Sequence, residues 1–177
     1  MTMPSVVVVT GIMAAGKSTV SQALAQRLPR SVHVRGDIFR RFVVNGYAAM
    51  SATPSEEALS HLRLRYWLAA STTDAYVDAG FSVVVQDIVI GSMLTEFLDM
   101  IRTRPIGLVV LVPSAVEVAR RETDRAKTGY TDFTPAELDR GLRESTPRIG
   151  LWLDSTNLSV DETVDAILEN VDALLIN

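Results

Sequence analysis

One short segment limits what this chain can fold into: residues 11–18 read GIMAAGKS, which matches the pattern G-x-x-x-x-G-K-[ST]. The run VVVV at 6–9 precedes it and is typical of a strand buried on both faces, and a helix is predicted over about 17–28. Glycines let such a loop wrap closely around phosphate oxygens, and the helix N-terminus adds its positive dipole. The segment therefore predicts a phosphate site, with an ordinary glycine-rich turn as the alternative.

The motif gives each of its polar residues a role. We expect Lys17 to reach the β- and γ-phosphates of a nucleotide and to act in catalysis, and the Ser18 hydroxyl to hold Mg²⁺. The predicted nucleotide contacts in and just after the loop are Gly11, Ala14, Ala15, Gly16, Lys17, Ser18 and Thr19.

Strands and helices are predicted to alternate along the rest of the chain. The predicted strands are 31–35, 82–86, 107–112 and 149–154, and the predicted helices are 38–44, 54–78, 94–102, 114–127, a short one from 134, and 159–175. Four helices begin at capping-box patterns, which lie at 53–56, 114–117, 134–137 and 159–162. Such alternation predicts one α/β domain over 1–177, with a parallel sheet between two layers of helices.

Composition excludes several classes of protein. The 177 residues carry 17 basic and 21 acidic side chains, a net charge of −4, which does not favour a nucleic-acid partner. Because the chain has no cysteine, it can form neither a disulfide nor a thiolate metal site. No apolar run approaches the ~20 residues that span a bilayer, and no signal-peptide pattern is present, so we expect a cytoplasmic protein without membrane contact.

Two aspartates follow predicted strands, at the edge where open α/β sheets bind ligands. A carboxylate at Asp37 could orient an acceptor hydroxyl and take its proton, with an N-cap for the helix at 38 as the alternative. Asp87 is suited to holding Mg²⁺ through water or to contacting the acceptor, with a turn or cap role as the alternative.

A basic segment follows the strand at 107–112 and contains Arg120, Arg121, Arg125 and Lys127. Guanidinium groups pair with phosphate oxygens and stabilise the charge of a phosphoryl group in transfer, so we expect at least one of them to be catalytic. The alternative is a solvated helix face with pairs at four-residue spacing, such as Glu117 with Arg121.

In this order the segments resemble the small-molecule P-loop kinases. The resemblance lies in the loop at 11–18, Gly36 with Asp37, VVVQD at 83–87 with Gly91, and RETDR at 121–125. It is nearest to the chloramphenicol phosphotransferase-like group and more distant to shikimate and gluconate kinases. It implies a five-stranded parallel sheet of order 2-3-1-4-5, Mg-ATP as phosphoryl donor and a hydroxyl acceptor.

The resemblance also implies roles for single residues. In these kinases the residue matching Asp37 contacts the acceptor hydroxyl and acts as base, and the segment at about 115–148 is a short helical lid over ATP. Arg121 and Arg125 match the catalytic pattern, and the further ATP contacts are expected at Arg120, Arg121, Lys127 and Asn157. The family often has an acid where this chain has Gln86, which leaves open whether Asp87 serves the metal or the acceptor.

The acceptor is expected to contact Asp37, Arg40, Phe42, Arg63 and Asp87. Arg40 could instead lie on the surface, and Phe42 could instead pack in the core. The predicted function is ATP-dependent transfer of a γ-phosphoryl group to a hydroxyl of a small molecule, an antibiotic or a metabolite, by a monomer or homodimer. The alternatives are a kinase of a sugar nucleotide or a nucleic-acid end, and a regulatory protein that binds ATP without transferring it.

Overall fold

The computed structural model describes residues 2–123 and 134–176. Its strands are β1 (Val6–Thr10), β2 (Ser31–Arg35), β3 (Ser82–Gln86), β4 (Ile106–Leu111), β5 (Leu151–Leu153) and β6 (Leu175–Ile176). Its helices are α1 (Lys17–Gln26), the 3-10 helix η1 (Gly36–Phe42), α2 (Glu56–Asp78), α3 (Met93–Met100), α4 (Ala115–Thr123), α5 (Pro135–Ser145), α6 (Val160–Glu169) and α7 (Val171–Leu174).

Five strands form a parallel sheet in the predicted order β2-β3-β1-β4-β5. The all-valine strand β1 lies in the middle and is completely buried, as its composition predicts. A sixth strand was not predicted: β6 pairs antiparallel with the beginning of β4, where Ile176 lies opposite Ile106. The predicted last helix ends at Glu169, and the chain then forms the short helix α7 before it joins the sheet.

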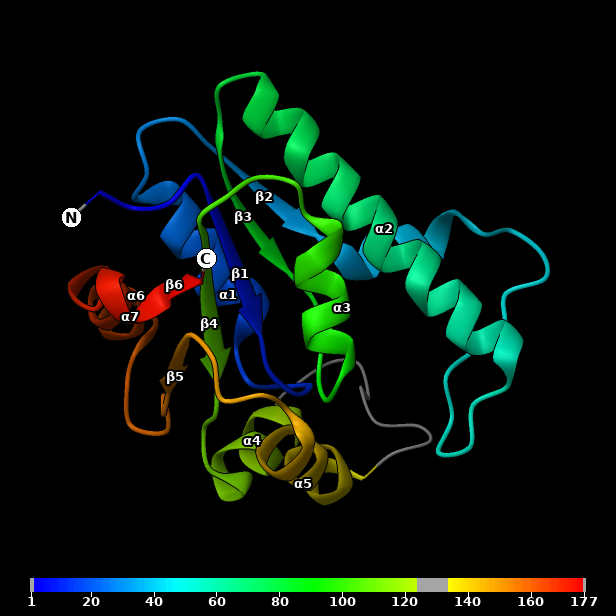
Figure 1. The fold of residues 1–177 in the computed structure, drawn as a ribbon. Helices are drawn as coiled ribbons and strands as arrows, with labels where there is room; N and C mark the ends of the chain where they lie inside the picture. The colour runs from blue at the N-terminus through cyan, green and yellow to red at the C-terminus, as the bar shows by residue number, and fades with distance from the viewer. Residues whose placement is uncertain (1, 124–133, 177) are drawn as a thin grey trace.

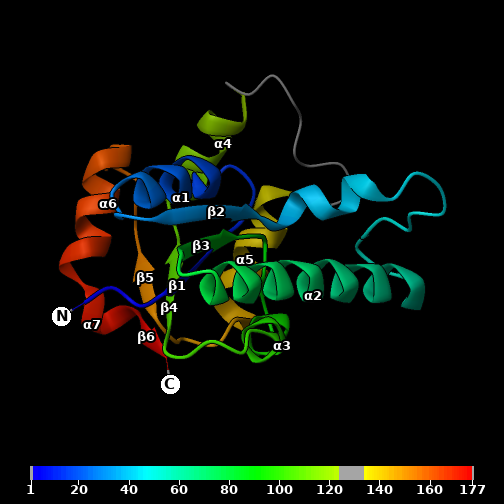
Figure 2. The same cartoon turned by 90° about the horizontal axis from the view of Figure 1, so that it is seen from above.

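Helices cover both faces of the sheet, which confirms the three-layer fold (Figure 2). Helices α1 and α6 lie on one face, and α2 and α3 lie on the other. Helices α4 and α5 pack together beyond the carboxyl ends of the strands, at the same end as the loop between β1 and α1 (Figure 1). No helix in the described part of the chain is long and apolar enough to cross a membrane.

The capping boxes predict helix starts with one exception. Thr134 and Ser159 each accept a bond from the backbone N–H three residues on, and the glutamates at those positions bond back, so α5 and α6 begin where expected. The pattern at 53–56 is misleading, because Ser55 is the N-cap of α2 and accepts from Ala58, so Thr53 and Pro54 lie outside the helix. Asp37 is not the N-cap of a helix that begins at residue 38, because it lies within the first turn of η1.

Candidate functional site

The phosphate loop has an unusual backbone between β1 and α1. Three of its residues have positive φ angles of 148°, 61° and 95°: Gly11, Ala14 and Gly16. A Cβ on Gly11 would lie 2.7 Å from the Leu111 carbonyl oxygen, so only glycine fits there. Lys17 is buried in the first turn of α1, and its Nζ donates to the Ile12 carbonyl oxygen at 2.7 Å. The loop thus holds its ammonium group close to its own backbone.

A cavity of about 460 Å³ lies beside this loop and is large enough for a nucleoside. Six of the predicted nucleotide contacts line it: Ala15, Gly16, Thr19, Arg120, Arg121 and Asn157. Its other walls come from the segment 155–160, which joins β5 to α6. The structure therefore brings the loop together with α4 and the β5–α6 connection: Arg121 is 106 residues from Ala15 of the loop and 34 residues from Ser155 of the connection.

Arg121 links these three elements. Its Nη1 donates to the Ala15 carbonyl oxygen at 3.3 Å and its Nη2 to the Ser155 carbonyl oxygen at 3.1 Å. Its Nε donates at 2.6 Å to Glu117, which realises the pair predicted from the four-residue spacing. Arg121 is therefore both a member of a helix pair and a wall of the cavity.

Glu117 holds both arginines of α4. Hydrogen bonds from Arg120 and then Arg121 lower the pKa of Glu117 from 4.5 to about 2. A group whose pKa falls on folding contributes stability that is present above its unfolded value and is lost as the pH drops through the folded one. The Glu117 contribution is therefore complete above about pH 4.5 and disappears toward pH 2.

We expect Glu117→Gln to weaken nucleotide binding about fivefold, because a neutral amide holds the two guanidinium groups less firmly than a carboxylate does. The dissociation constant of a fluorescent ATP analogue measures this. Asp165→Asn is the matched control, because it breaks the exposed ion pair with Arg27 at 2.9 Å and neither of these two residues lines the cavity. Equal affinities for all three proteins would contradict the role given to Glu117.

On the side of β1 away from β4, the sheet continues with β3 and then β2. In register, Arg35 lies opposite Gln86, so Gly36 faces Asp87. A Cβ on Gly36 would lie 2.2 Å from Asp87 Oδ2, so the carboxylate occupies the space that a side chain would need. The two predicted aspartates are thereby brought to the ends of adjacent strands, Asp87 directly after β3 and Asp37 one residue after its neighbour Gly36.

Asp87 is the partner of an arginine that is largely buried. Arg65 of α2 donates from Nε to Oδ2 at 2.8 Å and from Nη2 to Oδ1, and the Ile88 N–H donates to Oδ1 at 2.7 Å. Burial would lower the pKa of Arg65, but the charge of Asp87 and its hydrogen bonds raise it. The Asp87 side chain has no exposed surface, so neither a metal ion nor an acceptor can reach it unless Arg65 moves.

The loop and the strand ends differ in how well they suit Mg²⁺. Ser18 lies exposed directly after Lys17, where its hydroxyl oxygen can serve as a ligand for this hard cation. The Asp87 carboxylate, in contrast, already accepts three hydrogen bonds from protein groups. Of the two predicted ligands, the arrangement therefore suits Ser18 and not Asp87.

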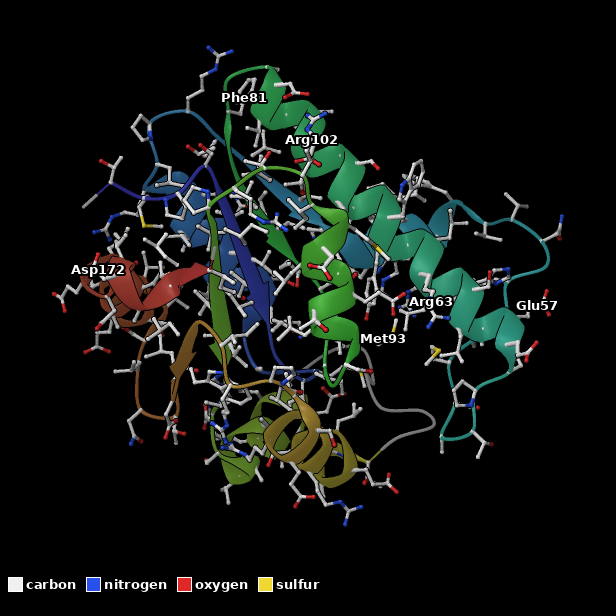
Figure 3. The ribbon with its side chains drawn as sticks, in the orientation of Figure 1. Glu57, Arg63, Phe81, Met93, Arg102 and Asp172 are labelled. Carbon is white, nitrogen blue, oxygen red and sulfur yellow. The ribbon has the colours of Figure 1, made fainter. Side chains whose placement is uncertain are left out.

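The remaining predicted acceptor contacts lie apart from this edge or on the surface. Arg63 pairs with Glu96 of α3 at 2.6 Å, and Figure 3 shows it on the part of α2 beside α3. Arg40 and Phe42 are exposed on η1. Arg125 and Lys127 lie outside the described residues, as does the middle of the predicted lid.

Two contributors to the site were not predicted for these roles. Arg65, not Arg63, donates hydrogen bonds to the Asp87 carboxylate at the end of β3. Gln86 donates a hydrogen bond to the Asp37 carboxylate. The residue after Arg65 is the buried Tyr66, whose hydroxyl donates to the Ile88 carbonyl oxygen at 2.7 Å. The sequence offers no local signal that Arg65 points inward, because Trp67, an aromatic residue of the same helix, is 55% exposed.

Known proteins share this architecture. A sugar kinase from Janibacter sp. HTCC2649 superposes with a TM-score of 0.69 at 19% identity, covering 95% of this chain and 94% of that one. A gluconokinase from Sinorhizobium meliloti 1021 gives 0.62 at 17% identity, with 97% and 94% covered. The tunicamycin resistance protein of Deinococcus radiodurans gives 0.64 at 15% identity, with 99% of each chain covered. These identities are low, so the likeness shows a common fold.

The family comparison covers the segments described above. No curated protein matches the chain. The model of the AAA domain family matches residues 6–147, which include the phosphate loop, both strand ends and the arginines of α4. Because this match spans most of the 177 residues, the chain belongs to the AAA domain family.

Proposed function

We propose that this protein is an ATP-dependent phosphotransferase that moves the γ-phosphoryl group to a hydroxyl of a small molecule. One observation carries the proposal. The phosphate loop follows the central strand β1, the nucleoside-sized cavity lies toward β4 and β5, and Asp37 lies toward β2 and β3. The triphosphate of a nucleotide held by the loop would thus extend from the cavity, which would hold the nucleoside, toward the Asp37 carboxylate.

In this mechanism the backbone of the loop and Lys17 bind the β- and γ-phosphates. The oxygen of the acceptor hydroxyl bonds to the γ-phosphorus while Asp37 accepts the proton of that hydroxyl. The bond between the γ-phosphorus and the bridging oxygen breaks, and ADP leaves with that oxygen. Arg121, and in the proposal Arg125, stabilises the charge of the phosphoryl group. Mg²⁺, held by Ser18 and the phosphates, would neutralise charge on the oxygens of ATP.

The chemical class of the acceptor is proposed by analogy with similar proteins. The resemblance to the chloramphenicol phosphotransferase-like group, and the fold shared with a tunicamycin resistance protein, support an antibiotic as acceptor. The folds shared with a sugar kinase and a gluconokinase support a metabolite. A panel of both kinds of alcohol, scored by ADP release, separates the two.

We expect Asp37→Asn to lower acceptor-dependent ADP release by a factor of about 10²–10⁴, the usual contribution of a general base, while ATP still binds. The measurement is kcat with an acceptor from the panel, together with the dissociation constant for ATP. Asp99→Asn, an exposed carboxylate of α3, is the control and is expected to leave kcat unchanged.

Other outcomes identify the alternatives. Tight ATP binding by the wild type with no product from any acceptor would indicate a regulatory nucleotide-binding protein. Phosphorylation of an oligonucleotide end, with an affinity that falls steeply with salt, would indicate a nucleic-acid kinase. Wild-type turnover by Asp37→Asn would show that another group accepts the proton.

A further inference from the structure

Gln86 is a buried polar residue at the end of the buried strand β3. It is 3% exposed, and its backbone is aligned with Val9 of β1 and with Arg35 of β2. A glutamine side chain in such a place must find a partner, because an unpaired buried amide is costly. Because β3 pairs with β1 on one side and β2 on the other, the backbone of Gln86 is fixed from both sides.

The partner of Gln86 is Asp37. Its Nε2 donates to Asp37 Oδ1 at 3.3 Å, and the chemistry sets this orientation, since a carboxylate accepts and only the amide nitrogen donates. Two arginines also approach Asp37, but at 3.7 Å for Arg35 and 3.8 Å for Arg41, and both are more than half exposed. Exposed pairs of that length hold a carboxylate weakly. Among the described residues, Gln86 makes the one hydrogen bond to the Asp37 side chain.

We propose that Gln86 is a positioning residue for Asp37. The inference rests on the proposed function, in which Asp37 accepts the acceptor's proton. By holding Oδ1 against β3, the amide fixes the rotation of the carboxylate and leaves Oδ2 for the acceptor hydroxyl. Asp37 itself lies in a short 3-10 helix and is 30% exposed, so its own surroundings leave it free to turn. The buried strand β3 thereby fixes the orientation of a side chain on η1.

Gln86→Met keeps the length of the side chain and removes the donor. We expect it to lower kcat with an acceptor by at least about tenfold, because small displacements of a reacting group are costly. ATP binding is expected to stay within about twofold of wild type, since the bond does not touch the loop or the cavity. Gln22→Met is the matched control, because Gln22 also bonds through its side chain, to His33 Nδ1 at 3.0 Å.

A double mutant separates positioning from a general structural effect. If Gln86 acts through Asp37, Gln86→Met combined with Asp37→Asn is expected to be no slower than Asp37→Asn alone. A further tenfold loss in the double mutant, or wild-type kcat in Gln86→Met, would overturn the inference. Gln86→Asn, which keeps a buried amide but is one methylene too short, serves if the methionine variant does not fold and is expected to show the same loss.

Crystal structures of wild type and Gln86→Met test the same point without an acceptor. The Asp37 carboxylate is expected to turn away from β3 in the variant, and an unchanged carboxylate would overturn the inference. Failure of the proposed function would look different. The wild type would then release no ADP with any acceptor, while the Asp37 carboxylate of the Gln86→Met variant would still differ in position from that of the wild type.

Discussion

Lys17→Met is expected to lower phosphoryl transfer by at least a factor of about 10²–10³, the usual effect of removing one donor that stabilises charge in a transition state. Lys17 is buried in the loop, and its ammonium group bonds to the Ile12 carbonyl oxygen at 2.7 Å. A bound triphosphate offers this ammonium stronger, charged acceptors a short distance away. The measurement is kcat for acceptor-dependent ADP release, with ATP affinity determined separately.

Lys17→Arg is the informative companion, because it keeps the charge and changes the shape. A guanidinium group is planar and larger than an ammonium, and Lys17 has only 8% of its surface exposed, so we expect the arginine variant to recover little activity. More than a tenth of wild-type kcat in Lys17→Met would contradict the role assigned to this side chain.

Arg65→Met is expected to lower the free energy of unfolding by about 3–5 kcal/mol, because it leaves the Asp87 carboxylate buried without its cation. Urea denaturation measures the loss. Arg63→Met is the matched control on the same helix: its pair with Glu96 is exposed, with 48% and 36% of the two side chains accessible, so its loss is expected to change stability much less than Arg65→Met does.

The combination of Arg65→Met with Asp87→Asn tests whether the pair itself is responsible. With both charges removed, the expected loss is smaller than the sum of the two single losses. Equal losses for Arg65→Met and Arg63→Met would show instead that Asp87 is solvated or otherwise paired, and would reopen its assignment to a metal ion.

Much of the fold could be predicted because it depends on local patterns. Four consecutive valines predict a buried strand, and the box at 159–162 predicts the start of α6, since both signals lie within a few residues. Prediction failed where packing competes with local preference. The segment around Asp37 forms a 3-10 helix. The chain after Glu169 leaves its helix to pair with β4, because the short strand β5 pairs only with Val109–Leu111 and leaves the backbone at the beginning of β4 free to accept hydrogen bonds on that side.

In the candidate site, too, the features that depend on local sequence could be predicted and those that depend on distant segments could not. The phosphate loop is contiguous, so its residues and their order were evident at once, and the places of Asp37 and Asp87 followed from the strands that precede them. Their partners were not evident. Arg65 lies 22 residues from Asp87, and Gln86 lies 49 residues from Asp37.

Sequence alone therefore predicted a phosphate-binding loop in an alternating α/β chain and two carboxylates at the strand ends, since each of these predictions rests on neighbours along the chain. Folding settled which carboxylate is accessible: Asp87 is enclosed by Arg65, whereas Asp37 is partly exposed and held by Gln86. The physical reason is that strand register and helix packing choose the partners of a charged group, and these depend on segments that are distant in sequence.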